Sequence, residues 1–422
     1  MENLNRAFLA HLFDSAVGAA DPMAALKAHL PAPPKGRTVV VGAGKGAAQL
    51  AQAFEALWQG PVEGVVVTRY GYGATCKTIR VMEAAHPVPD AAGIDAAQAL
   101  KDMVRDLGPD DLIIGLICGG GSSLLPDPPE GLELSDLQDL NNALLASGAP
   151  ISVMNDIRKC FSGINGGRLA ALAAPARVCN LIVSDVPGDA PGEVASGPTV
   201  PGRPSIAAVR QIIETRGITL TKRLTDFLAR QEADATAAND PRITTTIIAS
   251  ANISLDAAAA AARARGVAAW VLSDRIEGEA RDVAQVHAAL ALQTAQSSFP
   301  YPAPVVLLSG GETTVTLRHK GRGGRNSEFQ LALALALEGT DGITALAADT
   351  DGIDGSEDNA GAFADGQTAD RMRQAGVDPQ GHLQGNNAYT AFDAVGDLFV
   401  TGPTGTNVND FRAILIGDVP KA

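Results

Sequence analysis

Short runs of aliphatic residues alternate along the chain with longer stretches rich in alanine and leucine. These runs predict strands at 38–41, 65–67, 111–117 and 178–183 in the first half, and at 244–248, 269–272, 305–308, 343–348 and 398–400 in the second. The stretches between them are typical of helices and include 47–58, 91–107, 255–265 and 329–337. Strands that are apolar throughout are typical of parallel sheets buried on both faces by helices. The pattern therefore predicts an α/β fold.

The length of the chain, 422 residues, is too great for one ordinary hydrophobic core, so two domains are expected. The segment 221–241 is polar and rich in alanine, and it ends in an Asn-Asp-Pro sequence. Domain boundaries fall in such segments. We therefore expect an N-terminal domain over residues 1–240 and a smaller C-terminal α/β domain over residues 241–422.

Composition and charge narrow the class of protein. A hydrophobic content of 46% is that of a globular protein, and the net charge of −14 argues against a nucleic-acid partner. The N-terminus does not resemble a signal peptide, and no apolar run approaches the roughly 20 residues of a membrane span. The four cysteines form no CxxC pair and are expected to be reduced thiols. A cytoplasmic location without a membrane partner is expected.

The first glycine loop, residues 42–47, lies between a predicted strand and a predicted helix. With Gly42, Gly44 and Ala47 it has the G-x-G-x-x-G/A form of a dinucleotide-binding loop, and Gly46 lies between these positions. The acidic residue that such a site has after its second strand is replaced by Arg69, which leaves an NADP-binding role open. Lys45 favours a phosphate-handling site instead. The alternative for Lys45 is a solvated surface lysine.

The second glycine loop follows another predicted strand directly. It comprises Gly119, Gly120, Gly121, Ser122 and Ser123. Three glycines allow a ligand to approach the backbone closely, and two hydroxyl groups can bind its oxygens. A flexible turn is the other reading, but we favour ligand binding.

Asp189 follows the strand predicted at 178–183. Ligands of α/β sheets bind at the carboxyl ends of the strands, where Asp189 could orient a hydroxyl group, accept its proton or hold Mg²⁺. A local Asx-turn would also explain an aspartate here.

The second half carries a basic loop and an acidic loop. Glu312 follows the strand predicted at 305–308, and the arginine loop, residues 320–328, places Arg325 and Asn326 among glycines before a predicted helix. Arginine binds phosphate oxygens in a bidentate way, and helix starts favour anions. The acidic loop, residues 349–355, fails the calcium-loop pattern, but one or two of its carboxylates suit a hard cation. The segment 401–410 is a further polar loop.

Taken together, the segments 41–46, 86–90, 119–123, 309–326, 349–355 and 401–410 resemble the glycerate 2-kinase family, whose members are often labelled hydroxypyruvate reductases of tartrate utilisation. The resemblance covers nearly the whole chain. It implies an N-terminal Rossmann-like domain, a C-terminal MOFRL domain and an active site in the cleft between them. It also implies transfer of the γ-phosphoryl group of ATP, with Mg²⁺, to the 2-hydroxyl group of D-glycerate.

The resemblance further implies roles for individual residues. Lys45 and Arg325 would be the catalytic basic pair, with Asp189 as a third catalytic group, and Asp351 and Asp189 would hold the metal. The remaining binding residues would be Gly44, Gly46, Gly119 to Ser123, Glu312, Asn326 and Asn407. The chain departs from the family at Cys160, Asn165, Ala190 and Asn387-Ala388. At Asn165 the family commonly has lysine, so one potential anion contact is lost.

Two other functions are weighed against the kinase. An NAD(P)H-dependent hydroxypyruvate reductase would explain the fingerprint and Arg69, but it should pair a catalytic histidine with a carboxylate, and no such pair can be placed. A binding protein without catalysis would not need so many charged groups on separate strand ends. The expected partners are glycerate and ATP, and the chain is expected to be a monomer or homodimer.

Overall fold

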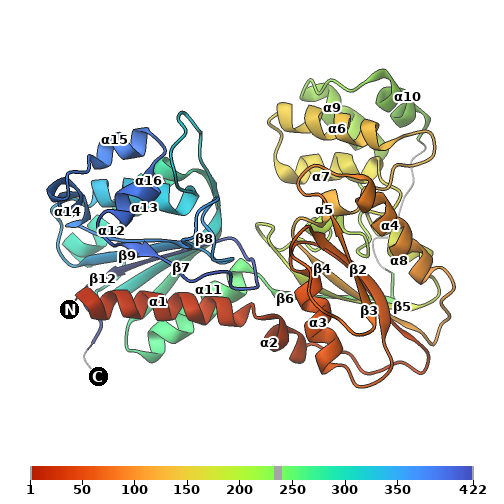
Figure 1. Ribbon diagram of the computed structural model, residues 1–422, viewed down its shortest axis with the longest axis horizontal. Helices are drawn as coiled ribbons and strands as arrows, with labels where there is room; N and C mark the ends of the chain where they lie inside the picture. The colour runs from red at the N-terminus through yellow and green to blue at the C-terminus, as the bar shows by residue number, and fades with distance from the viewer. Residues whose placement is uncertain (1, 232–239, 421–422) are drawn as a thin grey trace. The chain divides into compact units, whose positions relative to one another are not determined.

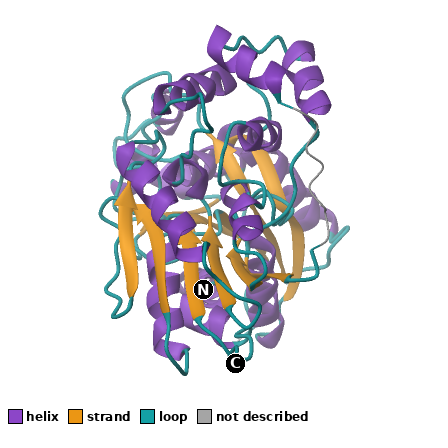
Figure 2. Cartoon of the chain, turned by 90° about the vertical axis from the view of Figure 1, so that its right-hand side faces the viewer, coloured by secondary structure: helices purple, strands orange, loops and turns teal. Residues whose placement is uncertain are grey.

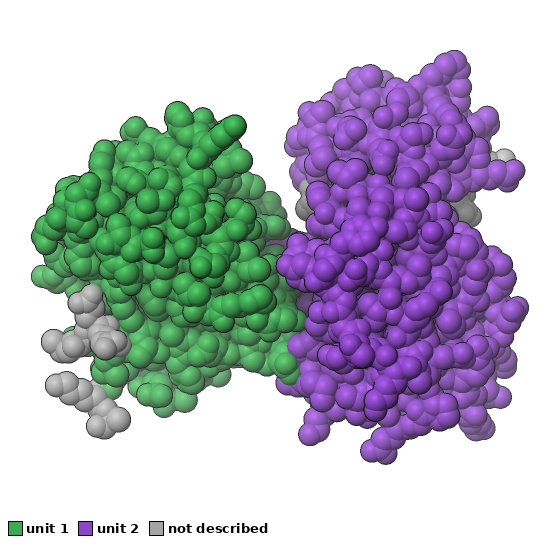
Figure 3. Space-filling model, viewed as in Figure 1, with its two compact units in different colours: residues 1–21, 249–422 green, residues 22–248 purple. Residues whose placement is uncertain are grey.

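The chain folds into two compact units, which Figure 3 shows in different colours. The structure, a computed structural model, describes residues 2–231 and 240–420. Unit 1 comprises residues 1–21 and 249–422, and unit 2 comprises residues 22–248. No helix within the described ranges is long and apolar enough to cross a membrane.

These units divide the chain differently from the expected boundary at 240/241. The first helix, α1 (Glu2–Ala19), buries Phe8, Leu9 and Leu12 in a core that it shares with α11 (Ala251–Ala264), so the N-terminus belongs to unit 1. The strand β6 (Ile243–Ala249) joins the sheet of unit 2. Of the segment expected to be a linker, 222–230 is helix α10, and residues 232–239 lie outside the described residues.

The sheet of unit 2 has the strand order β3-β2-β1-β4-β5-β6, the order of a Rossmann fold. Its strands are β1 (Thr38–Ala43), β2 (Glu63–Arg69), β3 (Ile79–Ala84), β4 (Leu112–Cys118), β5 (Arg177–Val183) and β6 (Ile243–Ala249). Strands β1 to β5 pair in parallel, which confirms the predicted strands of the first half. The strand β3 was not predicted, because its Arg80 and Glu83 interrupt the apolar run.

Helices cover this sheet and also form a separate layer within unit 2. The helices are α2 (Pro22–Lys27), α3 (Ala47–Leu57), α4 (Ala91–Val104), α5 (Gly121–Leu124), α6 (Leu134–Ala146), α7 (Ile151–Cys160), α8 (Arg168–Leu172), the 3₁₀ turn η1 (Val194–Ser196), α9 (Ile206–Thr215) and α10 (Lys222–Arg230). One core joins α4 and α8 to β1 and β2. A second core lies among α6, α7, α9 and α10 (Figures 1 and 2).

The sheet of unit 1 has the strand order β11-β10-β9-β12-β8-β7. Its strands are β7 (Ala268–Glu279), β8 (Val305–Thr314), β9 (Ile343–Asp349), β10 (Gly361–Asp365), β11 (Leu398–Phe399) and β12 (Asp410–Ile416). Among the described residues of this sheet, β7 and β8 pair in parallel and the other pairs are antiparallel, so this sheet is mixed. The reason is β12, which lies between β8 and β9 and runs antiparallel to both.

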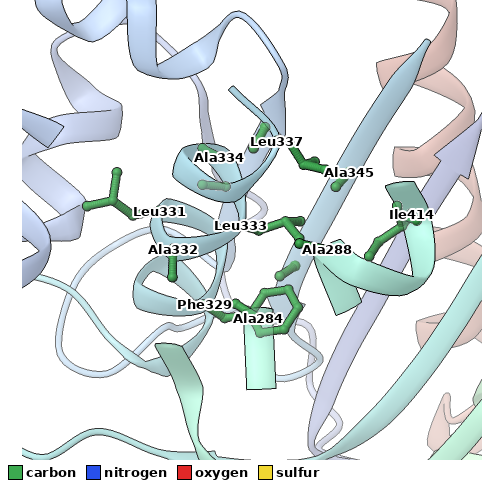
Figure 4. Packing of buried hydrophobic residues seen from close by; sticks show 14 of the residues in the cluster. Ala284, Ala288, Phe329, Leu331, Ala332, Leu333, Ala334, Leu337, Ala345 and Ile414 are labelled. Atoms are coloured by element: carbon green, nitrogen blue, oxygen red, sulfur yellow. The ribbon is translucent and has the colours of Figure 1, made fainter. Parts of the chain in front are cut away.

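Alternating residues of these strands face two helical layers. On one face Ile414 and Ile416 pack with α12 (Ala280–Ser297) and α13 (Arg325–Ala336), as Figure 4 shows for Phe329, Ala284 and their neighbours. On the other face Ala413 and Leu415 pack with α1 and α11 (Figure 1). The remaining helices of unit 1 are α14 (Thr368–Gln374), α15 (Pro379–Gln384) and α16 (Ala388–Asp393).

Candidate functional site

The two glycine loops of unit 2 are hydrogen-bonded to each other at the carboxyl ends of adjacent strands. The Lys45 amide donates to the Gly119 carbonyl at 2.9 Å, and the Gly44 amide donates to the Val67 carbonyl at 3.1 Å. The Thr68 hydroxyl group donates to the Lys45 carbonyl at 3.0 Å. The structure therefore brings the two predicted glycine loops together, and their binding role stays a prediction.

Glycine is required where the two loops meet. Gly44 has a φ of +134°, and a Cβ atom there would lie 2.3 Å from the Cys118 carbonyl oxygen. The Gly46 amide donates to the Cys118 sulfur at 3.2 Å. Burial raises the pKa of Cys118 to about 12, so this thiol stays neutral and packs beneath the loop. The close packing fixes the backbone that carries Lys45.

The Lys45 side chain lies over Gly120, which has a φ of +80°. A Cβ atom at Gly120 would lie 3.1 Å from Cε of Lys45 and 3.0 Å from Nε2 of His86. The Lys45 ammonium group forms no ion pair with any carboxylate that the structure describes. Burial lowers the pKa of His86 to about 4, and the charges of Lys45 and Arg69 contribute. This corner of unit 2 is thus positively charged, with a neutral imidazole beside it.

Both hydroxyl groups of the second glycine loop have partners within the protein. Ser122 shares a hydrogen bond of 2.8 Å with the hydroxyl group of Ser196, and the Ser123 hydroxyl group donates to the Gly120 carbonyl at 3.3 Å. Both residues belong to α5, whose N-cap is Gly120. The two serines therefore hold the loop in shape, and their binding role stays a prediction.

An aspartate that the sequence reasoning did not single out lies against this loop. A Cβ atom at Gly119 would come within 1.6 Å of Oδ2 of Asp185, so the carboxylate takes the space that a side chain would fill. Asp185 is the second residue after β5, a position that could have been read from the strand end. Asp189, the predicted residue, is half-buried with a φ of +55°, and its amide donates to the Val186 carbonyl at 3.0 Å.

In unit 1, Arg325 is held by three carboxylates from three strands. Its Nε donates to Oδ1 of Asp410 at 2.6 Å, and Nη2 donates to Oδ2 of Asp349 at 2.7 Å. Nη1 lies 3.4 Å from Oε1 of the exposed Glu312. Burial opposes the charge of Arg325, but Asp410, Asp349 and Glu312 together raise its pKa. The guanidinium group is therefore fixed and permanently charged.

The carboxylates around Arg325 differ in their protonation. Burial raises the pKa of Asp349 well above its usual range against the opposing charge of Arg325, and Asp351 and Asp410 add to the shift. Burial also acts to raise the pKa of Asp410, but Arg412 and Arg325 outweigh it and lower that pKa. Arg412 is itself buried and pairs with Asp410. The group thus contains a firmly ionised Asp410 beside a more readily protonated Asp349.

The start of α13 already binds a carboxylate of the protein. Oδ1 of Asp354 accepts from the Asn326 amide at 2.9 Å, and Oδ2 accepts from the Ser327 amide at 2.7 Å. The Asn326 side chain donates to Asp410 at 2.9 Å. Asp354 therefore occupies these two first-turn amides, and the binding role of Asn326 stays a prediction.

The predicted metal and polar-loop residues are held in turns. Oδ1 of Asp351 accepts from the Ile353 amide at 2.8 Å, and Oδ1 of Asn407 accepts from the Asn409 amide at 3.0 Å. No group of three or more histidine, cysteine, aspartate or glutamate side chains within 2–231 and 240–420 is arranged to hold a metal ion. Asn165, another departure from the family pattern, is buried, and its side-chain oxygen accepts no hydrogen bond in the structure.

Comparisons with known proteins match two families to successive parts of the chain. A domain family of unknown function, DUF4147, matches residues 8–229, and the MOFRL family matches residues 305–410. A protein of Agrobacterium vitis with the provisional name hydroxypyruvate reductase is 50% identical over 98% of this chain and 94% of its own length. The D-glycerate 2-kinase of Thermotoga maritima is 36% identical over 94% of each chain.

Solved structures show the same likeness across the whole chain. The crystal structure of a glycerate kinase from Thermotoga maritima superposes with a TM-score of 0.89 at 34% identity, covering 97% of this chain and 99% of the other. The fold and the order of both halves are therefore shared with that protein.

Proposed function

The chain belongs to the glycerate 2-kinase family of phosphotransferases, and on that premise we propose that it transfers the γ-phosphoryl group of ATP to the 2-hydroxyl group of D-glycerate. The observation that carries this proposal is the Lys45 ammonium group. The Lys45 side chain lies over Gly120, whose positive φ favours glycine. The ammonium group has no carboxylate partner among the residues described. An unneutralised lysine at a glycine loop suits a phosphoryl group.

In the proposed reaction the 2-hydroxyl oxygen of glycerate attacks the γ-phosphorus as the bond from that phosphorus to the β,γ-bridging oxygen breaks. ADP leaves, and the hydroxyl proton passes to Asp189. The proposed roles of Lys45 and Arg325 are to neutralise charge on the transferring group and on the substrate carboxylate. Such a transfer depends on alignment and charge neutralisation more than on covalent chemistry by the protein.

Magnesium binding is proposed for Asp351 and Asp189. Their carboxylate oxygens are ligands that Mg²⁺ prefers, and Mg²⁺ usually takes only one or two carboxylates along with substrate phosphates. Asp351 is half-buried, and only Oδ1 of its carboxylate accepts a hydrogen bond in the part of the chain described, so Oδ2 remains available. The Asp351 carboxylate therefore offers an oxygen of the kind that Mg²⁺ prefers, and the ion would neutralise phosphate charge when bound.

Reduction of hydroxypyruvate by NAD(P)H is the competing function, favoured by the name of the Agrobacterium vitis relative. The strand β2 ends in Arg69 where an NAD site would carry an acidic residue, which argues against NADH and leaves NADPH open. One feature argues against both cofactors. Within the described ranges His86 hydrogen-bonds no carboxylate that could orient it for hydride chemistry.

A paired assay separates the two functions. The protein is mixed with D-glycerate and Mg-ATP, and separately with hydroxypyruvate and NADPH or NADH. The kinase proposal expects ADP formation in the first mixture and no oxidation of the cofactor in the second. Cofactor oxidation without ADP formation would replace the proposal with the reductase.

A further inference from the structure

Four neighbouring strands of unit 2 bring chemically active groups to one edge of the sheet. The strand order β3-β2-β1-β4 places His86, Arg69, Lys45 and Gly120 after or at the ends of successive parallel strands. Arg69 pairs with Ala84, two residues before His86, in the register of β2 and β3. Of these four residues the proposed function uses Lys45 and Gly120, so Arg69 and His86 have no role yet.

Arg69 is a second cation without a counter-charge. Its Nε is buried and donates no hydrogen bond, and the guanidinium group forms no ion pair with any carboxylate in the described parts of the chain. Instead Cζ lies 3.5 Å from the centre of the Tyr72 ring. The backbone of Tyr72 is held by the Gln49 side chain of α3, which donates to its carbonyl at 3.1 Å. The ring thus supports a guanidinium group whose hydrogen-bonding capacity is unused.

His86 is fixed at the same place by its own loop. Oδ1 of Asp90 accepts from the Ala85 amide at 3.2 Å and from the Gly93 amide at 3.2 Å, which ties the loop to the start of α4. The Tyr70 hydroxyl group donates to Oδ2 of Asp90 at 2.8 Å, so this carboxylate is engaged. Nε2 of His86 then points to the space above Gly120 that the Lys45 side chain also borders.

We propose that Arg69 and His86 complete, with Lys45, a binding site for a phosphate-type oxyanion over Gly120. The inference rests on the proposed function in its choice of a phosphoryl group. Two cations without carboxylate partners match the two charges of a terminal phosphate better than the single charge of a carboxylate. Nε2 of the imidazole is placed to hydrogen-bond an oxygen of that group.

The charges that act on His86 explain why an anion should be detectable there. Lys45, after β1, and Arg69, at the end of β2, add to burial in lowering the pKa of His86 to about 4. A bound dianion would offset both cations and raise that pKa. His287 of unit 1 has a pKa that burial also lowers to about 4, but it lies in a packed core and is hydrogen-bonded to Ser309 at 2.9 Å. His287 is therefore an internal control.

The first test is a histidine NMR titration of the full chain between pH 5 and 8, with and without inorganic phosphate. The His86 resonance is assigned by its loss in His86→Gln. Without phosphate it should stay neutral over this range, and saturating phosphate should bring its titration into the range while His287 does not move. Phosphate that leaves His86 unchanged, or shifts both histidines alike, would overturn the inference.

The second test compares Arg69→Gln with Arg80→Gln, which removes an exposed arginine on neighbouring β3. A charge-assisted hydrogen bond to a bound anion corresponds to a loss of roughly 10- to 100-fold in phosphate affinity. We expect that loss in Arg69→Gln, partial recovery in Arg69→Lys and none in Arg80→Gln. Equal phosphate affinity in wild type and Arg69→Gln would contradict the proposal.

To identify which compound supplies the bound phosphate group, the titration is repeated with Mg-ATP, with 2-phosphoglycerate, with NADPH and with D-glycerate. The proposal expects the His86 response with ATP or 2-phosphoglycerate and none with glycerate, and an equal response to glycerate would overturn it. A response to NADPH alone, through its 2′-phosphate, would contradict the proposed function instead. Because these are binding measurements, they stand apart from turnover. A site that binds phosphate in a protein that phosphorylates nothing would sink the proposed function and leave this inference intact.

Discussion

The two charged clusters of the molecule treat their cations in opposite ways. In unit 1 Arg325 is bound by Asp410, Asp349 and Glu312. In unit 2 the cations Lys45 and Arg69 make no ion pair with the described residues. The charge of a cation surrounded by carboxylates is already neutralised within the protein. Cations without partners favour an anion.

This difference assigns distinct tasks to the two halves. The charges of the Arg325 cluster are paired within the protein, so their interaction stabilises unit 1. The charges of Lys45 and Arg69 are not paired in the free protein, so they can interact with a ligand. Disturbing the first should therefore change folding as well as the proposed turnover, whereas disturbing the second should change binding and turnover alone.

The largest effect is expected at Asp410. Alanine at this position leaves Arg412, which is 1% exposed, without its counter-charge. Removing one partner of a buried ion pair lowers the free energy of unfolding by about 3–5 kcal/mol. The chain has two tryptophans, and Trp270 lies in unit 1 whereas Trp58 lies in unit 2. Urea unfolding of unit 1 is followed by Trp270 fluorescence in a Trp58→Phe background.

The matched control is Glu338→Gln, which breaks an exposed pair with Arg373 in the same unit and should leave unfolding unchanged. If Asp410→Ala and the control unfold alike, the Arg325 cluster does not stabilise unit 1.

Lys45→Ala should have the next largest effect, on catalysis and not on folding. Loss of one electrostatic contact to a transition state commonly lowers kcat by about 10²–10³. Lys77→Ala, which removes an exposed lysine of unit 2, is the control and should keep full activity. Near-normal ATP-dependent phosphorylation of glycerate by Lys45→Ala would remove Lys45 from the mechanism.

Protonation of His287 should make the free energy of unfolding of unit 1 depend on pH. Its pKa is lowered from 6.5 to about 4 in the folded protein by burial, with a smaller contribution from Arg412. As pH falls below 6.5 the unfolded chain takes up the proton first, so the free energy of unfolding decreases between pH 6.5 and 4, by at most about 3 kcal/mol.

The decrease is measured by urea unfolding with the Trp270 signal at several pH values. His287→Gln carries no titrating group at this position and should decline less steeply over the same range. An equally steep decline in the variant would show that other groups produce the acid sensitivity of unit 1.

The smallest effect on stability is expected from Gly120→Ala. Gly120 and Gly217 both have left-handed backbones, with φ of +80° and +62°, so alanine at either position costs about 1 kcal/mol. Only at Gly120 would the new Cβ meet Lys45 and His86, since it has open space at Gly217. Gly120→Ala should therefore lower kcat by about tenfold or more, and Gly217→Ala should keep it. Equal activity would mean that Lys45 does not act from its observed position.

The sequence predicted the parallel sheet of unit 2 well, because each of its central strands is an unbroken apolar run. It failed at β12, where the buried Arg412 interrupts that run. A charged residue in an apolar run argues against a buried strand unless its charge is neutralised. Here Asp410 neutralises Arg412 and also binds Arg325, which is distant in the sequence, and a local sequence pattern does not show this arrangement.

The candidate site was also predicted only in part: the glycine loops follow from the strand pattern, whereas the partners of individual aspartates do not. Lys45 and the second glycine loop follow strands directly, and adjacent parallel strands bring them together. Asp354 was read as part of an acidic loop, but it caps α13, a pairing set by tertiary structure. Asp185 was passed over in favour of Asp189, since the sequence does not show which side chain fills the space beside Gly119.

The central claim is that this protein phosphorylates the 2-hydroxyl group of glycerate, and a phosphorus NMR spectrum of the products tests it most directly. The full chain is incubated with D-glycerate, ATP and Mg²⁺, and the spectrum is recorded with proton coupling. The account predicts a new phosphomonoester signal split into a doublet by the single proton on carbon 2. A triplet from a phosphate on carbon 3, or no phosphomonoester signal while NADPH is consumed with hydroxypyruvate, would contradict it.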